Sequence, residues 1–188
     1  MKQGKQIKLR DWIKEDLAEF KFWYMGKKKW MEYDAPYYEK PTKEEIQKRI
    51  NSIQEKIDSI NWETPRNKLV IATQTDNKLI GTVSWYWQSK ETNWKSIGIV
   101  IYSERNWGKG IGYEALKLWI DYLFEESHEI VRLDLRTWSG NEGMINLSKK
   151  VGFKEEARFR MARIVNGVYY DSIGMGLLRE EWNRKLVK

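Results

Sequence analysis

The chain has 188 residues, with 34 lysines and arginines against 27 aspartates and glutamates, which gives a formal net charge of +7. It contains no cysteine, which excludes disulfides, cysteine-based metal sites and a thiol nucleophile. The length suits one domain with a sizeable core, so we expect a single domain over residues 1–188. No apolar run approaches the ~20 residues of a membrane span and none follows Met1, so we expect a cytoplasmic protein without membrane contact.

The first half of the chain predicts a strand, two helices and then three strands in succession. Thr42 and Glu45 form a helix capping box, and the isoleucines at 46, 50, 53, 57 and 60 make one apolar stripe that we expect in the core. The middle strand of the three alternates cleanly between apolar and polar residues. The expected elements are a strand at 6–9, a helix at 14–24, an irregular segment at 26–41, the helix after Thr42, and strands at 68–74, 79–87 and 95–102.

The second half predicts a helix, a strand, a short helix and a hairpin. Gly152 suits a left-handed helix cap, and Asn166-Gly167 between two apolar runs is a strong hairpin signal. In this order the elements predict an α+β domain with one mixed, largely antiparallel sheet. The expected elements are a helix at 110–124, a strand at 130–137, a helix from Asn141 to Gly152, and strands at 157–165 and 168–178.

A glycine-rich loop lies between the strand at 95–102 and the helix that follows it. Glycines let backbone N–H groups approach a ligand closely, and the helix start adds unpaired donors and about half a positive charge. The loop therefore predicts a site for an anion such as pyrophosphate. The nucleotide-triphosphatase loop does not match, because no hydroxyl residue follows Lys109, and the dinucleotide fingerprint does not match the meander of strands upstream. The loop residues are Arg105, Asn106, Trp107, Gly108, Lys109, Gly110, Ile111 and Gly112.

The pattern Arg-x-x-Gly-x-Gly after a strand resembles the acyl-CoA pyrophosphate loop of the GNAT acetyltransferase superfamily. Motifs further along the chain resemble its ribosomal-protein N-acetyltransferase branch, and the resemblance covers Ile7 to Trp182. It implies a GNAT-like sheet flanked by helices, in which the strands before and after the loop and its helix splay apart to form the acyl-CoA cleft. The further motifs are Asn141 and residues 147–153, 155–158, Asp171 and 177–182.

The resemblance also implies acetyl-CoA as co-substrate, with no metal. The pantetheine arm of CoA enters the gap like an extra strand, so we expect its amides to pair with backbone groups of Ile99 and Ile101. Asn141 matches a position whose amide contacts the CoA arm, and a plain helix cap is its alternative role. The expected CoA-binding residues are Ile99, Val100, Ile101, Arg105, Asn106, Trp107, Gly108, Lys109, Gly110, Ile111, Gly112, Asn141 and Ser148.

The expected chemistry is direct attack of a neutral amine on the acetyl thioester in a ternary complex. At two positions the sequence departs from groups that relatives often carry: Ser96 replaces a glutamate base and Ser148 replaces a tyrosine acid. Ser148 is a candidate for donating a hydrogen bond to the thiolate or for positioning a water, and its alternative is a surface-facing helix residue. His128, the only histidine, is expected in a turn ~20 Å from the pyrophosphate end.

The acceptor pocket is expected to be walled by residues 30–39, residues 85–87 and the last hairpin. Among its carboxylates, Glu32, Asp34 and Glu39 are suited to recognise a cationic amine, and Glu32 and Asp34 are the catalytic candidates. A lysine-like amine with a pKa of ~10.4 costs roughly 4 kcal/mol to neutralise near pH 7.4, whereas an α-amine costs under about 1. The absence of a glutamate at position 96 therefore favours a protein N-terminus as acceptor.

Three alternatives stay open. The same fold with an enclosed acidic pocket would acetylate a small amine such as a polyamine or an aminoglycoside. The serines at 96 and 148 also suit a non-catalytic CoA-binding or regulatory module. The third is an RNA-associated protein, which would require the lysines to gather on one face and binding to weaken steeply with salt. Nucleic acid is not expected as the main partner, because the lysines are scattered over helix faces, as in residues 46–50. The eleven tryptophans leave a homodimer open.

Overall fold

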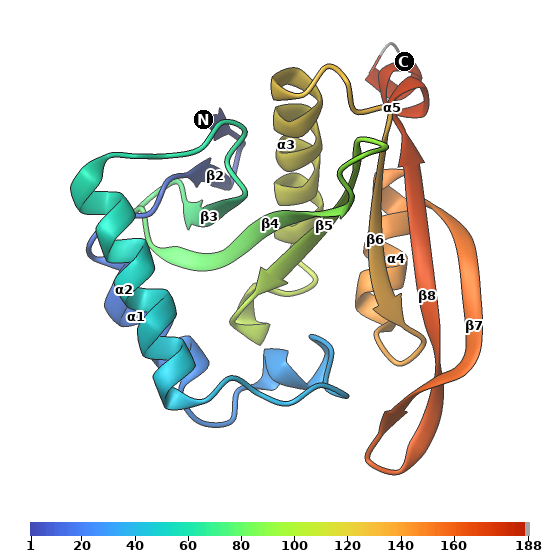
Figure 1. Ribbon diagram of the computed structural model, residues 1–188, viewed down its shortest axis with the longest axis horizontal. Helices are drawn as coiled ribbons and strands as arrows, with labels where there is room; N and C mark the ends of the chain where they lie inside the picture. The colour runs from blue at the N-terminus through green and yellow to red at the C-terminus, as the bar shows by residue number, and fades with distance from the viewer. Residues whose placement is uncertain (187–188) are drawn as a thin grey trace.

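The computed structural model describes residues 1–186, in which helices flank one open sheet (Figure 1). No helix among these residues is long and apolar enough to cross a membrane. The elements are β1 (Lys2–Gln3), β2 (Ile7–Arg10), α1 (Asp16–Tyr24), the 3-10 helix η1 (Lys29–Glu32), α2 (Lys43–Ser59), β3 (Lys68–Thr73), β4 (Leu79–Ser89), β5 (Trp94–Ile101), the 3-10 helix η2 (Glu104–Asn106), α3 (Ile111–Glu126), β6 (Arg132–Trp138), α4 (Glu142–Val151), β7 (Lys154–Val165), β8 (Val168–Leu178) and α5 (Arg179–Leu186).

The strands follow the order β1-β2-β3-β4-β5-β6-β8-β7 across the sheet. All neighbouring strands are antiparallel except β5 and β6, which run parallel. The predicted α+β fold with a mixed, largely antiparallel sheet is therefore confirmed. The structure adds β1, η1, η2 and α5 to the predicted elements, and it starts β7 at Lys154, because Lys154 and Glu155 pair with β8 ahead of an irregularity at Glu156.

The core has one layer on each face of the sheet, because alternate residues of a strand point to opposite faces. In β3, Leu69 and Ile71 pack with the residues of α3, whereas Val70 and Ala72 pack with those of α1 and α2. The capping box at the start of α2 is present as predicted. The prediction for Ile60 was wrong: α2 ends at Ser59, and Ile60 takes a left-handed conformation (φ 53°) with 81% of its side chain exposed.

The centre of the sheet is split. The parallel strands β5 and β6 pair only at Lys95 with Leu133 and at Ser96 with Asp134. Beyond this apex, residues 97–101 of β5 pair with β4 alone, and β6 pairs with β8 alone. Figure 1 shows the two strands diverging below their meeting point. The predicted splay is therefore present, and it leaves two strand edges facing each other across a gap.

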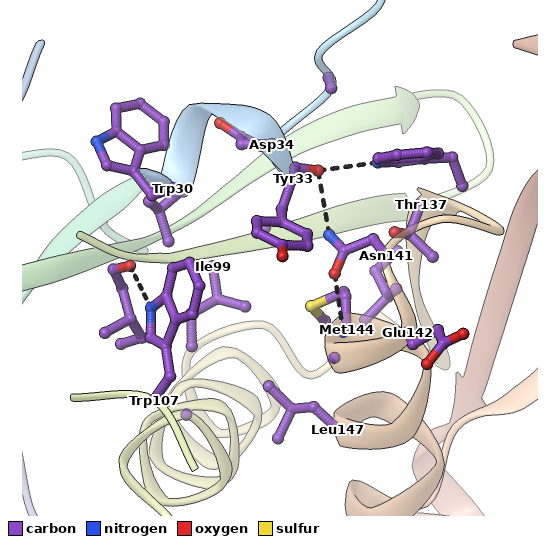
Figure 2. Close-up of a pocket in the computed structure, with 18 of the residues that line it drawn as sticks. Trp30, Tyr33, Asp34, Ile99, Trp107, Thr137, Asn141, Glu142, Met144 and Leu147 are labelled. Carbon is purple, nitrogen blue, oxygen red and sulfur yellow. Dashed lines mark hydrogen bonds between the residues drawn. The ribbon is translucent and has the colours of Figure 1, made fainter. Parts of the chain in front are cut away.

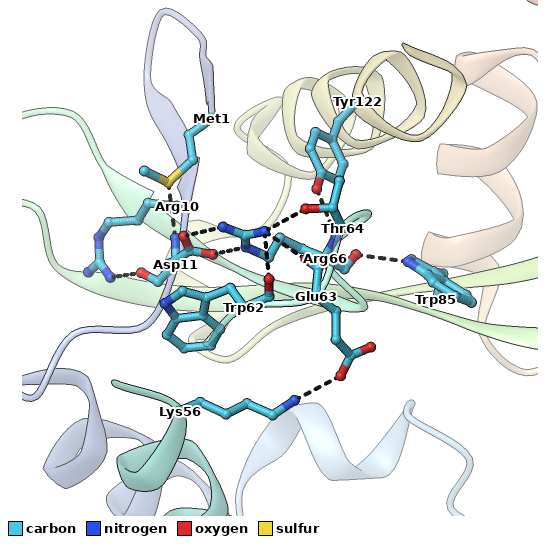
Figure 3. A network of polar contacts seen from close by, with 10 residues as sticks. All are labelled: Met1, Arg10, Asp11, Lys56, Trp62, Glu63, Thr64, Arg66, Trp85 and Tyr122. Carbon is cyan, nitrogen blue, oxygen red and sulfur yellow. Dashed lines mark hydrogen bonds and ion pairs between the residues drawn. The ribbon is translucent and has the colours of Figure 1, made fainter. Parts of the chain in front are cut away.

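A polar network fixes the loop that leads into β3 (Figure 3). Arg66 donates to the Asp11 carboxylate at 2.8 Å, and its backbone N–H donates to the Tyr122 hydroxyl of α3 at 2.7 Å. The Trp85 indole donates to the Arg66 carbonyl at 2.8 Å. Trp85 and Trp87 also both lie beside the Lys95 ammonium. These contacts place the two tryptophans away from the acceptor pocket that the sequence assigned to them.

Candidate active site

A cavity of about 770 Å³ occupies the gap between β5 and β6. The glycine loop and α3 form one end, the start of α4 forms one wall, and the segment after η1 lies across the opening (Figure 2). Lining residues from these elements include Tyr33, Asp34, Gly98, Ile99, Val100, Ile101, Asn106, Trp107, Gly108, Gly110, Gly112, Arg136, Thr137, Asn141, Glu142, Met144 and Leu147.

The gap-facing edge of β5 offers backbone groups to a ligand. The Tyr102 N–H donates to Ile80 O of β4 at 3.0 Å, so the alternation of an antiparallel ladder turns the N–H and C=O of Ile99 and Ile101 toward the gap. The Ile101 carbonyl already accepts a hydrogen bond from the Trp107 indole at 2.9 Å. Ile99 therefore presents the open donor and acceptor in the middle of the cavity.

The start of α3 has the backbone conformation of an anion cradle. Gly108 (φ 69°) and Gly110 (φ 83°) both take left-handed conformations that favour glycine. Gly110 precedes the helix without any side-chain cap, and the first helical bond runs from Glu114 N–H to Gly110 O at 3.0 Å. The N–H groups before Glu114 are thus left for a ligand, as is usual for the first turn of a helix.

Three residues of the glycine loop, Arg105, Lys109 and Ile111, do not line the cavity. Arg105 and Lys109 are exposed, and Ile111, the first residue of α3, is buried in the core. The Lys109 carbonyl accepts from the Gln6 side chain at 3.3 Å, which ties the loop to the N-terminal strands. Their expected contacts with CoA stay predictions.

Asn141 serves as the cap of α4 and as a link across the cavity. Its side-chain oxygen accepts from Met144 N–H at 3.0 Å, and its side-chain nitrogen donates to the Tyr33 carbonyl at 3.1 Å (Figure 2). The Trp138 indole donates to the same carbonyl at 2.9 Å. The segment after η1 is therefore fixed to the opposite wall at Tyr33, next to Asp34.

The structure separates the carboxylates of this segment. Asp34 lines the cavity, where it is open to cleft solvent but has protein on its other sides; this partial removal of water raises the pKa of its carboxyl, while Lys40 and Lys68 lower it. Lys68 lies near enough to Asp34 for each charge to affect the pKa of the other, and burial lowers the pKa of the Lys68 ammonium. Glu32 is exposed, pairs with Lys29 at 2.6 Å and lies outside the lining, as does Glu39.

Ser148 is fully buried in α4, and its hydroxyl donates to Ile145 O at 2.8 Å. It is outside the cavity lining, so its expected role toward the thiolate stays a prediction. His128 lies in an exposed turn, as expected.

Sequence reasoning missed Asp134. Its carboxyl is 5% exposed and lies on β6 opposite Ser96, at the apex of the gap. Burial raises the pKa of Asp134, and the nearby Ser96 hydroxyl, Arg136 and Arg132 lower it. The sequence signal was a single acid inside the apolar strand at 130–137, between Leu133 and Leu135.

Comparison with known proteins gives consistent relatives. A family model described as an acetyltransferase (GNAT) domain matches residues 6–154. The chain is 27% identical over 112 residues to the SPbeta prophage-derived uncharacterized N-acetyltransferase YokL of Bacillus subtilis (strain 168), in a match that spans 60% of this chain and 62% of that protein. It is 30% identical over 141 residues to the probable N-acetyltransferase YjcK of the same organism, spanning 74% of this chain and 75% of that protein.

Solved structures share the fold. The spermidine N-acetyltransferase from Vibrio cholerae in complex with CoA and spermine superimposes with a TM-score of 0.73 at 19% identity, over 95% of this chain and 98% of that one. RimL, a ribosomal L7/L12 alpha-N-protein acetyltransferase in complex with coenzyme A, gives a TM-score of 0.70 at 17% identity, over 93% and 95%. Because the family model matches most of its length and the cleft has the expected architecture, this chain belongs to the GNAT acetyltransferase family.

Proposed function

We propose that this protein is an acetyl-CoA-dependent N-acetyltransferase that moves an acetyl group to a primary amine in a ternary complex, without a covalent enzyme intermediate. The observation that carries the proposal is the open edge of β5, which runs directly toward the uncapped, glycine-bearing start of α3. The two CoA complexes among the similar structures support the same ligand here. We expect the reaction to take place in the cytoplasm.

The residues present fit acetyl-CoA. A pyrophosphate at the start of α3 would meet free N–H groups, and an extended pantetheine arm would pair with Ile99 as a strand pairs with a sheet edge. From Ile101 to Ile97 the strand covers four residues, or about 13 Å. The acetyl end of such an arm therefore falls near the apex formed by Ser96 and Asp134.

The transfer forms a bond between the amine nitrogen and the acetyl carbon and breaks the carbon–sulfur bond of the thioester. A neutral amine loses one proton, and the CoA sulfur gains one. The protein's part is to hold the two reactants in contact, exclude competing water and accept the proton of a charged amine. Asp34 is the cavity carboxylate that we assign to binding the amine, because it stands in the wall opposite α4.

The charge of the cavity favours an acceptor with a single amine. Its lining carries two carboxylates, Asp34 and Glu142, and two cations, Arg136 and Lys150. A polyamine has several cationic centres and requires an excess of carboxylates. We therefore infer a protein N-terminus, the type of acceptor named for RimL, and we keep a small amine, the type named for the spermidine N-acetyltransferase, as the second candidate.

Release of free thiol from acetyl-CoA tests the proposal. The acceptors to compare are a ribosomal-type N-terminal peptide, a lysine peptide with a blocked N-terminus, spermidine and an aminoglycoside. Release with the first alone supports N-terminal acetylation, and release with spermidine or the aminoglycoside alone moves the assignment to a small amine. No release with any of them, while acetyl-CoA raises the melting temperature, would contradict catalysis and support a CoA-binding module.

A further inference from the structure

A group of buried polar atoms without partners lies at the apex of the gap. Among the described residues, six buried side-chain nitrogen or oxygen atoms lack a hydrogen bond, and four of them are Trp94 Nε1, Ser96 Oγ, Arg132 Nε and Asp134 Oδ1. Trp94 and Ser96 are on β5, and Arg132 and Asp134 are on β6. Buried polar groups in proteins are normally satisfied by protein or by ordered water. Ser96 and Trp94 lie close enough to the Asp134 carboxyl for their polar groups to lower its pKa, and one ordered water in this niche would satisfy the atoms that have no partner.

The niche lies beside the reaction cavity, and its residues Ser96 and Asp134 are buried just behind the cavity lining. Ile97 follows Ser96 on β5, and Leu133 and Leu135 flank Asp134 on β6. These three side chains belong to the core on the α3 face of the sheet, so Ser96 and Asp134 point to the other face of the sheet. On that face the next residue along β5 is Gly98 and the next along β6 is Arg136, and both line the cavity. The niche is therefore one residue away from the place where the acetyl end falls.

We propose that Asp134 is the general base of the transferase and takes the proton of the acceptor amine through a water held by Ser96. This inference rests on the proposed function. An ammonium gives one proton through the water to the carboxylate and becomes a neutral amine. The nitrogen then bonds to the acetyl carbon as the carbon–sulfur bond breaks, its second departing proton ends on the CoA sulfur, and Asp134 releases its proton to solvent.

The surrounding charges suit this role. Arg132 pairs with Glu156 of β7 at 2.6 Å and stacks on Trp94, so its charge is already shared. The Glu156 carboxyl lies over Gly176 of β8, the residue that pairs with Asp134. Arg136 is exposed on the cavity side, and the titratable group on the β4 side is Tyr86, which pairs with Ser96. A buried carboxylate with a raised pKa has a higher proton affinity, which makes it a stronger base.

The niche removes one argument about the acceptor, namely that the absence of a glutamate at position 96 favours a protein N-terminus. The serine at 96 left no base in β5, which favoured an α-amine because it needs least help to lose its proton. Asp134 supplies a carboxylate across the strand pair from the same serine. The serine at position 96 is therefore no longer a reason to prefer an α-amine over a more basic amine as the acceptor.

Three variants test the proposal: Asp134→Asn, Ser96→Ala, and the control Asp58→Asn, an exposed aspartate of α2 outside the cavity lining. We expect Asp134→Asn to lower kcat by about 100-fold or more near pH 7, with the dissociation constant for acetyl-CoA unchanged by calorimetry. Ser96→Ala lowers kcat less, and Asp58→Asn leaves it unchanged. The deficit of Asp134→Asn shrinks as the pH rises above the pKa of the amine, because the amine then loses its proton without help.

The outcomes separate this inference from the proposed function. If the wild-type protein shows no turnover with any amine, the proposed function fails. If it turns over and Asp134→Asn matches it, only the role of Asp134 fails. If Asp134→Asn loses activity together with acetyl-CoA affinity or with a fall in the melting temperature of the unliganded protein, Asp134 is structural and the proposal is overturned. A deficit that stays constant with pH overturns it too.

Discussion

The side-chain nitrogen of Asn141 donates to the backbone carbonyl of Tyr33 at 3.1 Å, which joins the start of α4 to the segment on the other side of the cavity. The Trp138 indole donates to the same oxygen at 2.9 Å. Two donors on one acceptor hold the residue next to Asp34, so Asn141 positions the acceptor side of the cleft while it caps α4. The side-chain oxygen of Asn141 caps α4 and its side-chain nitrogen holds Tyr33, so substitutions can remove one function and keep the other.

Asn141→Ala removes both bonds, whereas Asn141→Asp keeps the capping oxygen and loses the donor to Tyr33. We expect Asn141→Ala to lower the free energy of unfolding by about 1 kcal/mol. Asn141→Asp should lower it less, and both should raise KM for the amine because Asp34 is less firmly placed. Urea unfolding and steady-state kinetics measure the two effects. An aspartate variant with the wild-type KM would show that the Trp138 bond alone fixes the segment.

Gly110 and Gly26 form a matched pair for testing the anion cradle. Both have left-handed φ values, 83° and 72°, but only Gly110 lines the cavity. Alanine at either position adds about 1–2 kcal/mol of backbone strain. We expect both variants to lose similar stability in chemical unfolding, while only Gly110→Ala weakens acetyl-CoA binding in calorimetry, because it shifts the N–H groups of α3. Equal affinities in the two variants would place the pyrophosphate elsewhere.

Asp34 and Glu32 were equal candidates in the sequence, and the structure places only Asp34 in the cavity wall. We expect Asp34→Asn to raise KM for the amine about 10-fold or more, since a hydrogen bond to a charged partner contributes about 1.5–3 kcal/mol. Glu32→Gln loses an exposed pair with Lys29, which is worth little. Kinetics with saturating acetyl-CoA compare the two variants. A larger effect at Glu32 would mean that the acceptor lies outside the cavity.

Asp134 gives the protein a defined dependence of stability on pH. Burial raises the pKa of its carboxyl in the folded protein above that in the unfolded chain, so the folded protein binds more protons between these two pKa values. This contribution to stability is fully present below the unfolded pKa and is lost as the pH rises through the folded pKa. The variant Asp134→Asn cannot ionise. Its melting temperature should therefore exceed that of the wild type at neutral pH.

Thermal unfolding of the unliganded proteins between about pH 3 and pH 8 measures this difference, since the window starts near the ordinary aspartate pKa. The two melting temperatures should converge in acid. A variant that melts lower than the wild type at every pH would show that the carboxyl makes a stabilising hydrogen bond.

Features set by local chemistry were predicted well. The capping box at Thr42 and the turn at Asn166-Gly167 each depend on a few neighbouring residues. The order of elements and the resemblance in the glycine loop then indicated the splayed sheet. Ile60 was misplaced because periodicity alone does not show where a helix ends, and α2 ends one residue before it.

The missed parts of the site depend on contacts between distant segments. Asp134 meets Ser96 only because β5 and β6 pair at two positions before they diverge, and no local pattern gives that register. Asn141 reaches Tyr33 across more than a hundred residues of chain. Trp85 was assigned to the pocket from its strand, but alternation turns its side chain to the opposite face, toward Arg66.

The two pairs that join β5 to β6 are also the only strand pairing between the halves of the sheet within residues 1–186. A ligand laid along the gap would bond to the β5 edge and touch α4 beside β6, and so would act as a ninth strand that links the halves. Binding to the folded state alone stabilises it by mass action. The resistance of this protein to unfolding and to proteolysis would then rise with the acyl-CoA concentration around it, and its abundance would follow the supply of its own substrate.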